Sequence, residues 1–436
     1  MTVRIKRKLQ GEWLVLFVLT LPFFFFLFIN VFQLSDAIKY LIDIAWVILL
    51  VLLVIGRKTL PNRSIKKIVA VIGCFVALTA IVYIASYQSI LYYLWGMRNN
   101  LRFYVFLIAC VMFLTKESSN AYFTFMDRLF FVNFIVTLFQ FLFLHTRQDY
   151  LGGIFGIQKG CNGYTNIFIL IVVIWHTLKY INGQESFGKC ASRCLMGLLV
   201  AALAELKVFF VEFLLTVVLA TLFTKFSARK LWIIVVAALG LFVALEVINQ
   251  LFPHFANWFS MEGILKIIAS RSGYTNSNDM NRLTFFSISM ERFLDTWPRK
   301  LVGLGLGNCD YASGFDFLTT PFYSMHRNLH YTWLSSAFLL LETGIVGFGL
   351  YLWVFVQIYL GARQRQKKGL ADPILCQMAR IMAVMCPILV IYNSSLRTEA
   401  GYMVYFVLAL PFLKKDGRTR SAAFDKGKEV ANVEKG

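Results

Sequence analysis

Blocks of about 20 consecutive apolar residues recur along almost the whole chain, and no other feature restricts its fold as strongly. A helix of that length crosses a hydrocarbon core about 30 Å thick, and a helix satisfies its own backbone hydrogen bonds in lipid. Only 15% of the 436 residues are charged, whereas a soluble domain carries about a quarter. The sequence therefore predicts an all-α polytopic membrane protein.

The apolar blocks predict about twelve transmembrane helices. They fall near residues 12–32, 36–55, 66–86, 100–114, 123–144, 162–181, 194–206, 208–224, 231–249, 331–360, 374–393 and 400–414. One large polar loop, 249–330, lies between the ninth and tenth spans and is expected to contain short helices. Residues 1–414 would then form a single integral membrane domain, followed by a disordered cytoplasmic tail at 415–436.

Basic residues set the predicted orientation, because Lys and Arg accumulate in short cytoplasmic loops. The loops on one side of the predicted bundle carry most of them: Arg4 to Lys8, Arg57 to Lys67, Lys179 to Arg193, Lys225 to Lys230, Arg363 to Lys368, and Lys414 with Lys415. This alternation requires both termini in the cytoplasm and the 249–330 loop outside. The net charge of +20 then reflects mainly the basic residues that set the orientation in the membrane. No nucleic-acid partner is expected, because the basic loops are short and separate.

An arginine leads an amphipathic segment within the outer loop. Apolar residues at three- and four-residue steps predict one helix over 283–297, which Pro298 is expected to end. Arg282 falls in its first turn, where a guanidinium and free backbone N–H groups can bind an anion, although an ordinary surface arginine fits the same pattern. The glycine run at 303–307 is interpreted as a turn that lets the backbone approach a neighbouring helix or ligand closely.

Two of the five histidines lie at the end of this loop. His326 and His330 are four residues apart, so they would share one face of a helix. One reading is a histidine that positions or deprotonates a hydroxyl, and the other is an ordinary residue of the membrane interface. A third metal ligand is not evident nearby, so no metal site is predicted.

Other polar residues are expected on the outer side or at membrane depth. Lys207 lies at a tight break between two short spans. Arg397 lies between the last two spans, where pairing with Glu399 or snorkelling to the membrane interface is the alternative to a functional role. Glu342 falls inside the tenth span, and Asn162 ends an external, glycine-rich turn.

These motifs, in this order, resemble the O-antigen polymerases and O-antigen ligases, polytopic enzymes of bacterial surface polysaccharide assembly. The resemblance is carried by four places in the chain: Arg282-Leu283 through Trp297-Pro298 to the 303–307 glycines; His330-Tyr331-Thr332-Trp333-Leu334; Glu342-Thr343-Gly344-Ile345-Val346-Gly347; and Gly153-Ile154-Phe155-Gly156 with Asn162. Together they span residues 152–347, and the topology covers the whole chain.

The resemblance implies a metal-independent glycosyltransferase without a cofactor, in the bacterial cytoplasmic (inner) membrane, with its active site facing outward. Its substrate would be an oligosaccharide linked to undecaprenyl diphosphate, and its partners the lipid bilayer, a flippase and a chain-length regulator. Arg282, with Lys207 and Arg397, would neutralise the diphosphate, and His330 would align or deprotonate the acceptor hydroxyl. Asn162 and Glu342 would contribute to substrate binding.

Two positions depart from the family's pattern. Lys207 stands where the family usually has an arginine, and lysine lacks the bidentate fork of a guanidinium. The spacing from histidine to glutamate is about one helical turn longer than usual, so either His326 or His330 fits the functional position. Leu334 follows in the expected place and favours His330.

Four functions fit the sequence to different degrees. The leading prediction is a repeat-unit polymerase for O-antigen, capsule or exopolysaccharide, with another lipid-linked repeat unit as acceptor. An O-antigen ligase, with lipid A–core as acceptor, is the nearest alternative. A lipid-glycan flippase or transporter would place its polar residues along a central path, whereas these collect on the outer side. A non-catalytic assembly scaffold is the remaining alternative.

The predicted orientation can be tested by labelling. A cysteine introduced at Ser313 should react with a membrane-impermeant maleimide in intact cells, or in spheroplasts of a two-membrane host, because 249–330 is expected outside. A cysteine at Lys368 should react only after lysis, with the wild-type chain as the blank. Labelling of the Ser313 position only after lysis would contradict an outward-facing site.

Overall fold

The computed structural model describes residues 2–56, 60, 62–224, 227–251, 279–312 and 314–413. These residues are helical and contain no strand. The main helices are α1 (Thr2–Thr20), α2 (Leu41–Ile55), α3 (Arg63–Ala85), α4 (Ile90–Phe113), α5 (Lys116–Leu142), α6 (Asn162–Ile181), α7 (Phe187–Leu203), α8 (Lys207–Phe223), α9 (Arg229–Leu251), α11 (Phe285–Ile288), α12 (Trp297–Val302), α13 (Pro321–His326), α14 (Ser335–Lys367), α15 (Pro373–Tyr392) and α16 (Ala400–Ala409). The predicted tail, Ser313 and residues 252–278 of the predicted outer loop lie outside the described residues.

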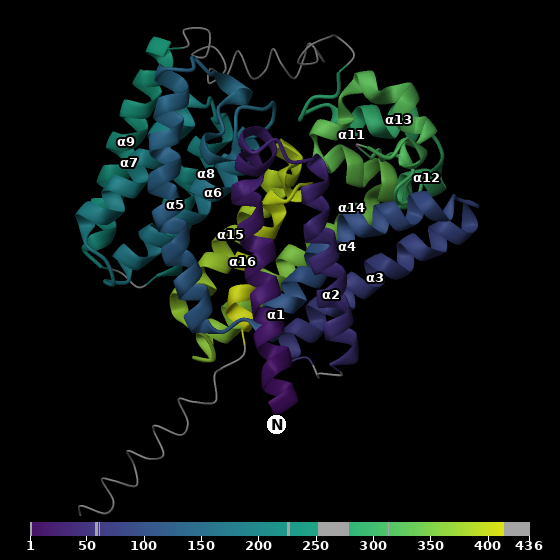
Figure 1. Cartoon of the computed structure of the whole chain (residues 1–436), viewed down its shortest axis with the longest axis horizontal. Helices are drawn as coiled ribbons and strands as arrows, with labels where there is room; N and C mark the ends of the chain where they lie inside the picture. Colours follow the sequence, from purple (N-terminus) through teal and green to yellow (C-terminus); the bar gives the residue numbers. More distant parts are fainter. Residues whose placement is uncertain are drawn as a thin grey trace, which may run out of the picture.

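The helices form two groups around a shared centre. Helices α5–α9 stand on one side of Figure 1 and α2–α4 with α11–α13 on the other, while α1, α15 and α16 run between them. Helix α15 packs on α14, α6 and α8, and α16 packs on α4 and α6. The central helices are more buried than the outer ones: 89% of the most apolar stretch of α6 is buried inside the protein, against 17% of that of Asp36–Ile55. The exposed apolar side chains of the outer helices are those expected to face lipid.

The prediction of a helical membrane protein is confirmed. Six helices among the described residues are long and apolar enough to cross a membrane: Asp36–Ile55, Arg63–Ala85, Lys116–Leu142, Asn162–Ile181, Ser335–Lys367 and Pro373–Tyr392. Two shorter apolar helices cover Leu9–Phe24 and Ala400–Phe412. The count of twelve spans and the placing of one large outer loop stay predictions.

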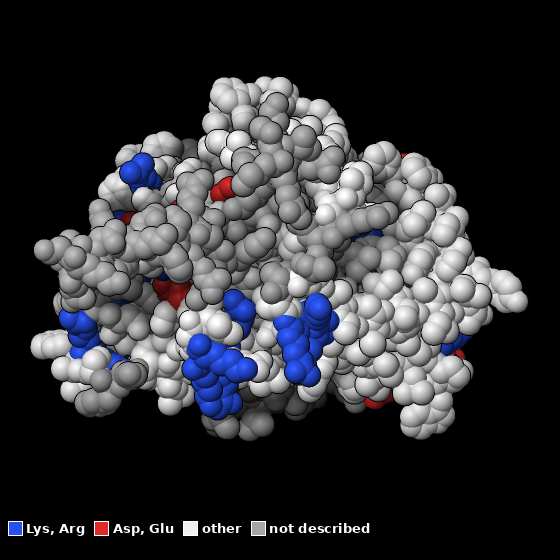
Figure 2. Space-filling model, turned by 90° about the horizontal axis from the view of Figure 1, so that it is seen from below, with Lys and Arg blue, Asp and Glu red and all other residues white. Residues whose placement is uncertain are grey.

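Helix α1 begins and α16 ends at the same end of the bundle, the lower end of Figure 1. Exposed cations stand at the start of α3 (Lys66 and Lys67) and at the end of α14 (Lys367 and Lys368). Figure 2 views the molecule from this end and shows several Lys and Arg clusters, with few acidic residues among the described atoms. The 279–334 segment with α11–α13 lies toward the opposite end.

The glycine run at 303–307 packs against a backbone kink in α14; it belongs to the 279–334 segment, which we call the outer segment. Gly344 has φ 63° inside the helix, which interrupts the helical hydrogen bonds. The carbonyls of Leu341 and Glu342 instead accept from the N–H groups of Leu304 (2.8 Å) and Gly305 (3.1 Å). A Cβ at Gly303, whose φ is +80°, would come within 2.4 Å of the Glu342 backbone. The predicted close approach of the 303–307 turn to a neighbouring helix is confirmed.

The amphipathic segment is organised differently from the prediction. A single helix over 283–297 was expected to end at Pro298, but α11 covers only Phe285–Ile288, is followed by a wider turn over Ser289–Phe293, and ends there. Pro298 lies in the first turn of a separate helix, α12. Proline has no N–H to donate, and first-turn N–H groups have no helical partner, so Pro298 begins a helix here instead of ending one.

A buried polar cluster ties α5, α6 and α7 together. The ring of His176, fully buried on α6, contacts Asp127 of α5 (3.1 Å) and Glu185 (2.6 Å) through its two nitrogens. Lys189 and Arg193 of α7 pair with the same carboxylates. Each buried charge therefore has a partner, as the low-dielectric interior requires.

Gly303→Ala should destabilise the protein by about 1–3 kcal/mol, because the new Cβ combines a left-handed backbone with a clash against α14. Gly349→Ala is the matched control, since nothing lies within 4 Å of its Cβ position. Thermal unfolding of the purified proteins in detergent should show a lower midpoint for the first variant only. Equal midpoints would contradict the docking of the turn against the kink.

Candidate functional site at the outer segment

Two short pieces of the outer segment lie side by side and form the centre of the site. The N–H of Met280 donates to the carbonyl of Leu329 at 2.9 Å. The adjacent residues Asp279 and His330 also contact each other, with His330 Nδ1 3.0 Å from Asp279 Oδ1. The Asp279 side chain is fully buried, while that of His330 is 30% exposed. Because an ionised carboxylate only accepts, Nδ1–H donates to it, which leaves Nε2 as the proton-accepting nitrogen.

The backbone of His330 is held in an unusual conformation. Its φ of 53° and ψ of 23° are left-handed, between the short turns Arg327–Leu329 and Tyr331–Trp333. The imidazole stacks on the Trp333 ring at 4.1 Å, and Lys159 Nζ lies 4.8 Å from the centre of that ring. A non-glycine residue in this region costs about 1–3 kcal/mol and often marks a functional site. His330 is therefore fixed by a hydrogen bond to a buried carboxylate, a stacked ring and its own backbone.

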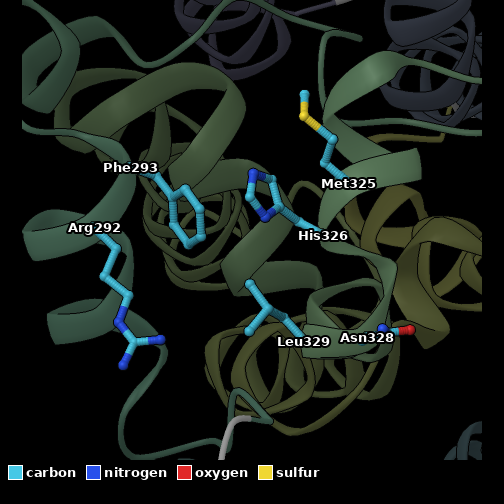
Figure 3. A pocket seen from close by; sticks show the side chains of 6 residues that line it. All are labelled: Arg292, Phe293, Met325, His326, Asn328 and Leu329. Atoms are coloured by element: carbon cyan, nitrogen blue, oxygen red, sulfur yellow. The ribbon is translucent and has the colours of Figure 1, made fainter.

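His326 has a different environment, so the expected shared helical face is wrong. It ends α13, and the chain leaves the α-helix before His330. Its ring packs against Phe293 (4.9 Å) and Phe322 (4.7 Å) beside a cavity of about 370 Å³. Figure 3 shows His326 facing Phe293, with the guanidinium of Arg292 and the amide of Asn328 directed away from it. His326 thus lies among apolar rings, without a carboxylate partner among the described contacts.

Arg282 follows Asp279 by three residues and is anchored to the bundle. Its Nε donates to the carbonyl of Tyr392 at 2.7 Å, and its guanidinium lies 4.0 Å from the Tyr392 ring centre. The expected place in the first turn of a helix is wrong, since Arg282 precedes α11 by three residues. Its position is set instead by the end of α15.

Lys207 lies close enough to Arg282 to interact with it electrostatically. The predicted break between the two short spans is confirmed: α7 ends at Leu203, Glu205 adopts φ 51°, and Lys207 begins α8. Burial raises the pKa of the Glu205 carboxyl, while Gln148 and Lys207 oppose that rise. Burial and the neighbouring Arg282 lower the pKa of Lys207, while Glu205 and Asp149 oppose that fall. Two cations this close repel each other, and an anion bound between them would offset that repulsion.

The remaining predicted residues divide between this site and its surroundings. Asn162 Nδ2 donates to Asp149 at 2.8 Å, and Asp149 is itself within electrostatic range of Lys207. Glu342 is buried, and one of its oxygens accepts from the N–H of Cys309 at 3.4 Å. Arg397 is placed elsewhere: its Nη2 lies 2.8 Å from Asp310, not beside Glu399, and its guanidinium covers the Phe338 ring.

Sequence reasoning missed several residues of the site. The sequence assigned no functional role to Asp279, Lys159, Trp333 or Tyr392. The pairing of Met280 with Leu329 across about 50 residues has no periodic signature in the sequence. We call the group Asp279, Arg282, Lys207, His330 and Trp333 the His330 site.

The His330 site combines a carboxylate-held imidazole with two cations at one end of the bundle. An imidazole held in this way can accept a proton from a hydroxyl, and fixed cations can stabilise a developing negative charge. Among the residues that the structure describes, no three His, Cys, Asp or Glu side chains come together as a metal site. No protein-family model and no curated protein matches this chain.

Proposed function

We propose that the protein is a polysaccharide repeat-unit polymerase that transfers a glycan from undecaprenyl diphosphate to a hydroxyl of another lipid-linked repeat unit. The observation that carries the proposal is that Asp279, which lies 3.0 Å from His330 Nδ1, precedes Arg282 by only three residues. Arg282 in turn lies within electrostatic range of Lys207. Glycosyl transfer from a lipid diphosphate needs a base for the incoming hydroxyl and cations for the leaving diphosphate.

In the proposed reaction, the acceptor hydroxyl oxygen bonds to the anomeric carbon of the donor glycan. Its proton passes to Nε2 of His330, whose Nδ1–H remains bound to Asp279. The bond between the anomeric carbon and the diphosphate oxygen breaks, and the diphosphate leaves with the electron pair. Arg282 and Lys207 stabilise the charge that develops on it.

The proposal includes a bacterial cytoplasmic membrane, twelve spans, two cytoplasmic termini and an outward-facing site. Support comes from the arrangement of the bundle, since α1 begins and α16 ends at the end opposite the 279–334 segment (Figure 1). The Lys and Arg clusters of Figure 2 lie at the end where α1 begins, as the charge bias of cytoplasmic loops favours.

The same chemistry serves a ligase, which differs in using lipid A–core as acceptor. Comparing the two acceptors with one purified protein separates these functions. A flippase or a non-catalytic scaffold requires neither proton transfer nor bond cleavage, so either one predicts no product in such an assay. Neighbouring genes for glycosyltransferases and a flippase would favour the polymerase.

Arg282→Ala should abolish polymer formation from lipid-linked repeat units, and Arg282→Lys should restore little of it, because the bidentate contact with phosphate is lost. Lys207→Arg should be tolerated and Lys207→Glu should not. Arg327→Ala, a change in the same outer segment, is the control. Product is measured by gel electrophoresis at equal protein levels; near-normal polymer from Arg282→Ala would remove the diphosphate assignment.

His330→Ala should leave only trace activity, since general base catalysis contributes about 10²–10⁴-fold. Asp279→Asn should lower kcat and alter its pH profile, because the carboxylate that orients the imidazole is lost. His326→Ala, on the neighbouring turn, should cost much less. Initial rates across pH test all three variants, and a loss confined to His326→Ala would mean that the other histidine is the base.

A further inference from the structure

A second, larger cavity lies beside the His330 site. It has a volume of about 670 Å³, within the range of about 300–1,000 Å³ that small-molecule sites occupy. Its walls come from the Asp36–Ile55 region, α4, the pairs Asp310–Tyr311 and Gly314–Phe315, and the connection between α15 and α16. Thr332, two residues after His330, also lines it. The cavity therefore reaches the chain segment that carries the imidazole.

The charges on its walls are paired with one another. Arg98 binds the Asp43 carboxylate with two nitrogens, and Arg397 pairs with Asp310 at 2.8 Å. Arg102 pairs with Glu399 at 3.3 Å, and Lys39 pairs with Asp36 at 3.1 Å. The four cations and four carboxylates of the lining thus balance. We call this space the paired-ion cavity.

Amide and tyrosine groups join these pairs into longer networks. Asn99 accepts from Arg98 (2.6 Å) and donates to Asp310 (2.7 Å). Tyr164 donates to the second oxygen of Glu399 at 2.5 Å. Two guanidinium atoms, Nη1 of Arg397 and Nε of Arg102, are buried without a hydrogen-bond partner in the described part of the chain. The walls are therefore polar, and hydrogen bonds connect their charged groups.

Aromatic rings complete the lining. Trp95, Tyr40, Tyr311 and Phe315 all border the cavity. The rings of Tyr40 and Phe315 lie 5.6 Å apart, and Trp95 Nε1 donates to the carbonyl of Tyr311 at 3.2 Å. Rings beside planar amide, carboxylate and guanidinium groups suit a sugar, because the C–H face of a pyranose packs on a ring while its hydroxyls bond to the polar groups.

We infer that the paired-ion cavity binds the uncharged sugars of the acceptor glycan, an inference that rests on the proposed function. Charge balance argues against the diphosphate as its ligand, since each wall cation already has a carboxylate. The displacement requires the hydroxyl and the leaving group on opposite sides of the anomeric carbon. With the diphosphate at Arg282, an acceptor bound in the cavity would approach His330 from the side of Thr332, which lines the cavity.

Binding to purified protein tests the inference with two probes: the lipid-free, phosphate-free oligosaccharide of the repeat unit, and inorganic pyrophosphate. Trp95→Ala and Phe315→Ala should each raise the Kd for the oligosaccharide about tenfold, the effect of losing one aromatic contact, and leave pyrophosphate binding unchanged. Arg282→Ala should weaken pyrophosphate binding alone. Trp297→Ala removes an exposed ring outside the cavity and should change neither.

The outcomes separate this inference from the proposed function. Wild-type affinity for the oligosaccharide in both cavity variants, or no oligosaccharide binding by the wild-type protein, overturns the sugar assignment even if polymer forms. Weakened pyrophosphate binding in the cavity variants would show an anion site and would overturn it as well. Absence of polymer from the wild-type protein counts against the proposed function itself. Unchanged thermal unfolding shows that each variant is folded.

Discussion

The buried carboxylate of Asp310 joins the outer segment to the membrane bundle, and much of the site's geometry depends on it. One of its oxygens accepts from Asn99 of α4 at 2.7 Å and from Arg397, between α15 and α16, at 2.8 Å. Leaving one partner of such a buried pair alone costs about 3–5 kcal/mol, because a charge would stay in a low-dielectric interior without compensation. Three segments far apart in the sequence are therefore held in one arrangement.

The kink in α14 provides a second attachment for the same segment. The carbonyls freed at Gly344 accept from Leu304 and Gly305, so the helix and the outer turn satisfy each other's backbone groups. The chain between these attachments and α14 carries His330. A strained residue such as His330 persists only when its surroundings hold it, and here a buried carboxylate, a stacked tryptophan and two anchored flanks do so.

Two kinds of electrostatic environment lie next to each other at this end of the molecule. Arg282 and Lys207 are two cations within electrostatic range of each other, so an anion bound between them would relieve their mutual repulsion. In the paired-ion cavity each cation has its own carboxylate, so the walls offer hydrogen bonds without net charge. A lipid-linked glycan has the same division, with an anionic diphosphate joined to polar sugars. The proposed catalytic imidazole lies on the chain between them, two residues before Thr332, which lines the cavity, and paired with Asp279, three residues before Arg282.

The sequence by itself determined the membrane class and most helix positions, because the length and periodicity of an apolar stretch depend only on consecutive residues. Helix α4 shows the limit: its span was predicted to begin near residue 100, yet the helix begins at Ile90. Polar residues such as Arg98 and Asn99 break the apolar pattern, and only their partners Asp43 and Asp310 explain why they lie inside the bundle.

The candidate site divides in the same way. The order of the motifs was enough to select Arg282, Lys207 and His330 as candidates. The short polar stretch before Lys207 was enough to predict the tight break there. The Asp279 partner, the separation of His326 from His330, and the pairing of Arg397 with Asp310 instead of Glu399 were decided by the tertiary structure. Each of these is a contact between residues that are distant in sequence or a left-handed turn held by such contacts. Periodicity and local propensity carry no information about them, because packing of the whole bundle selects them.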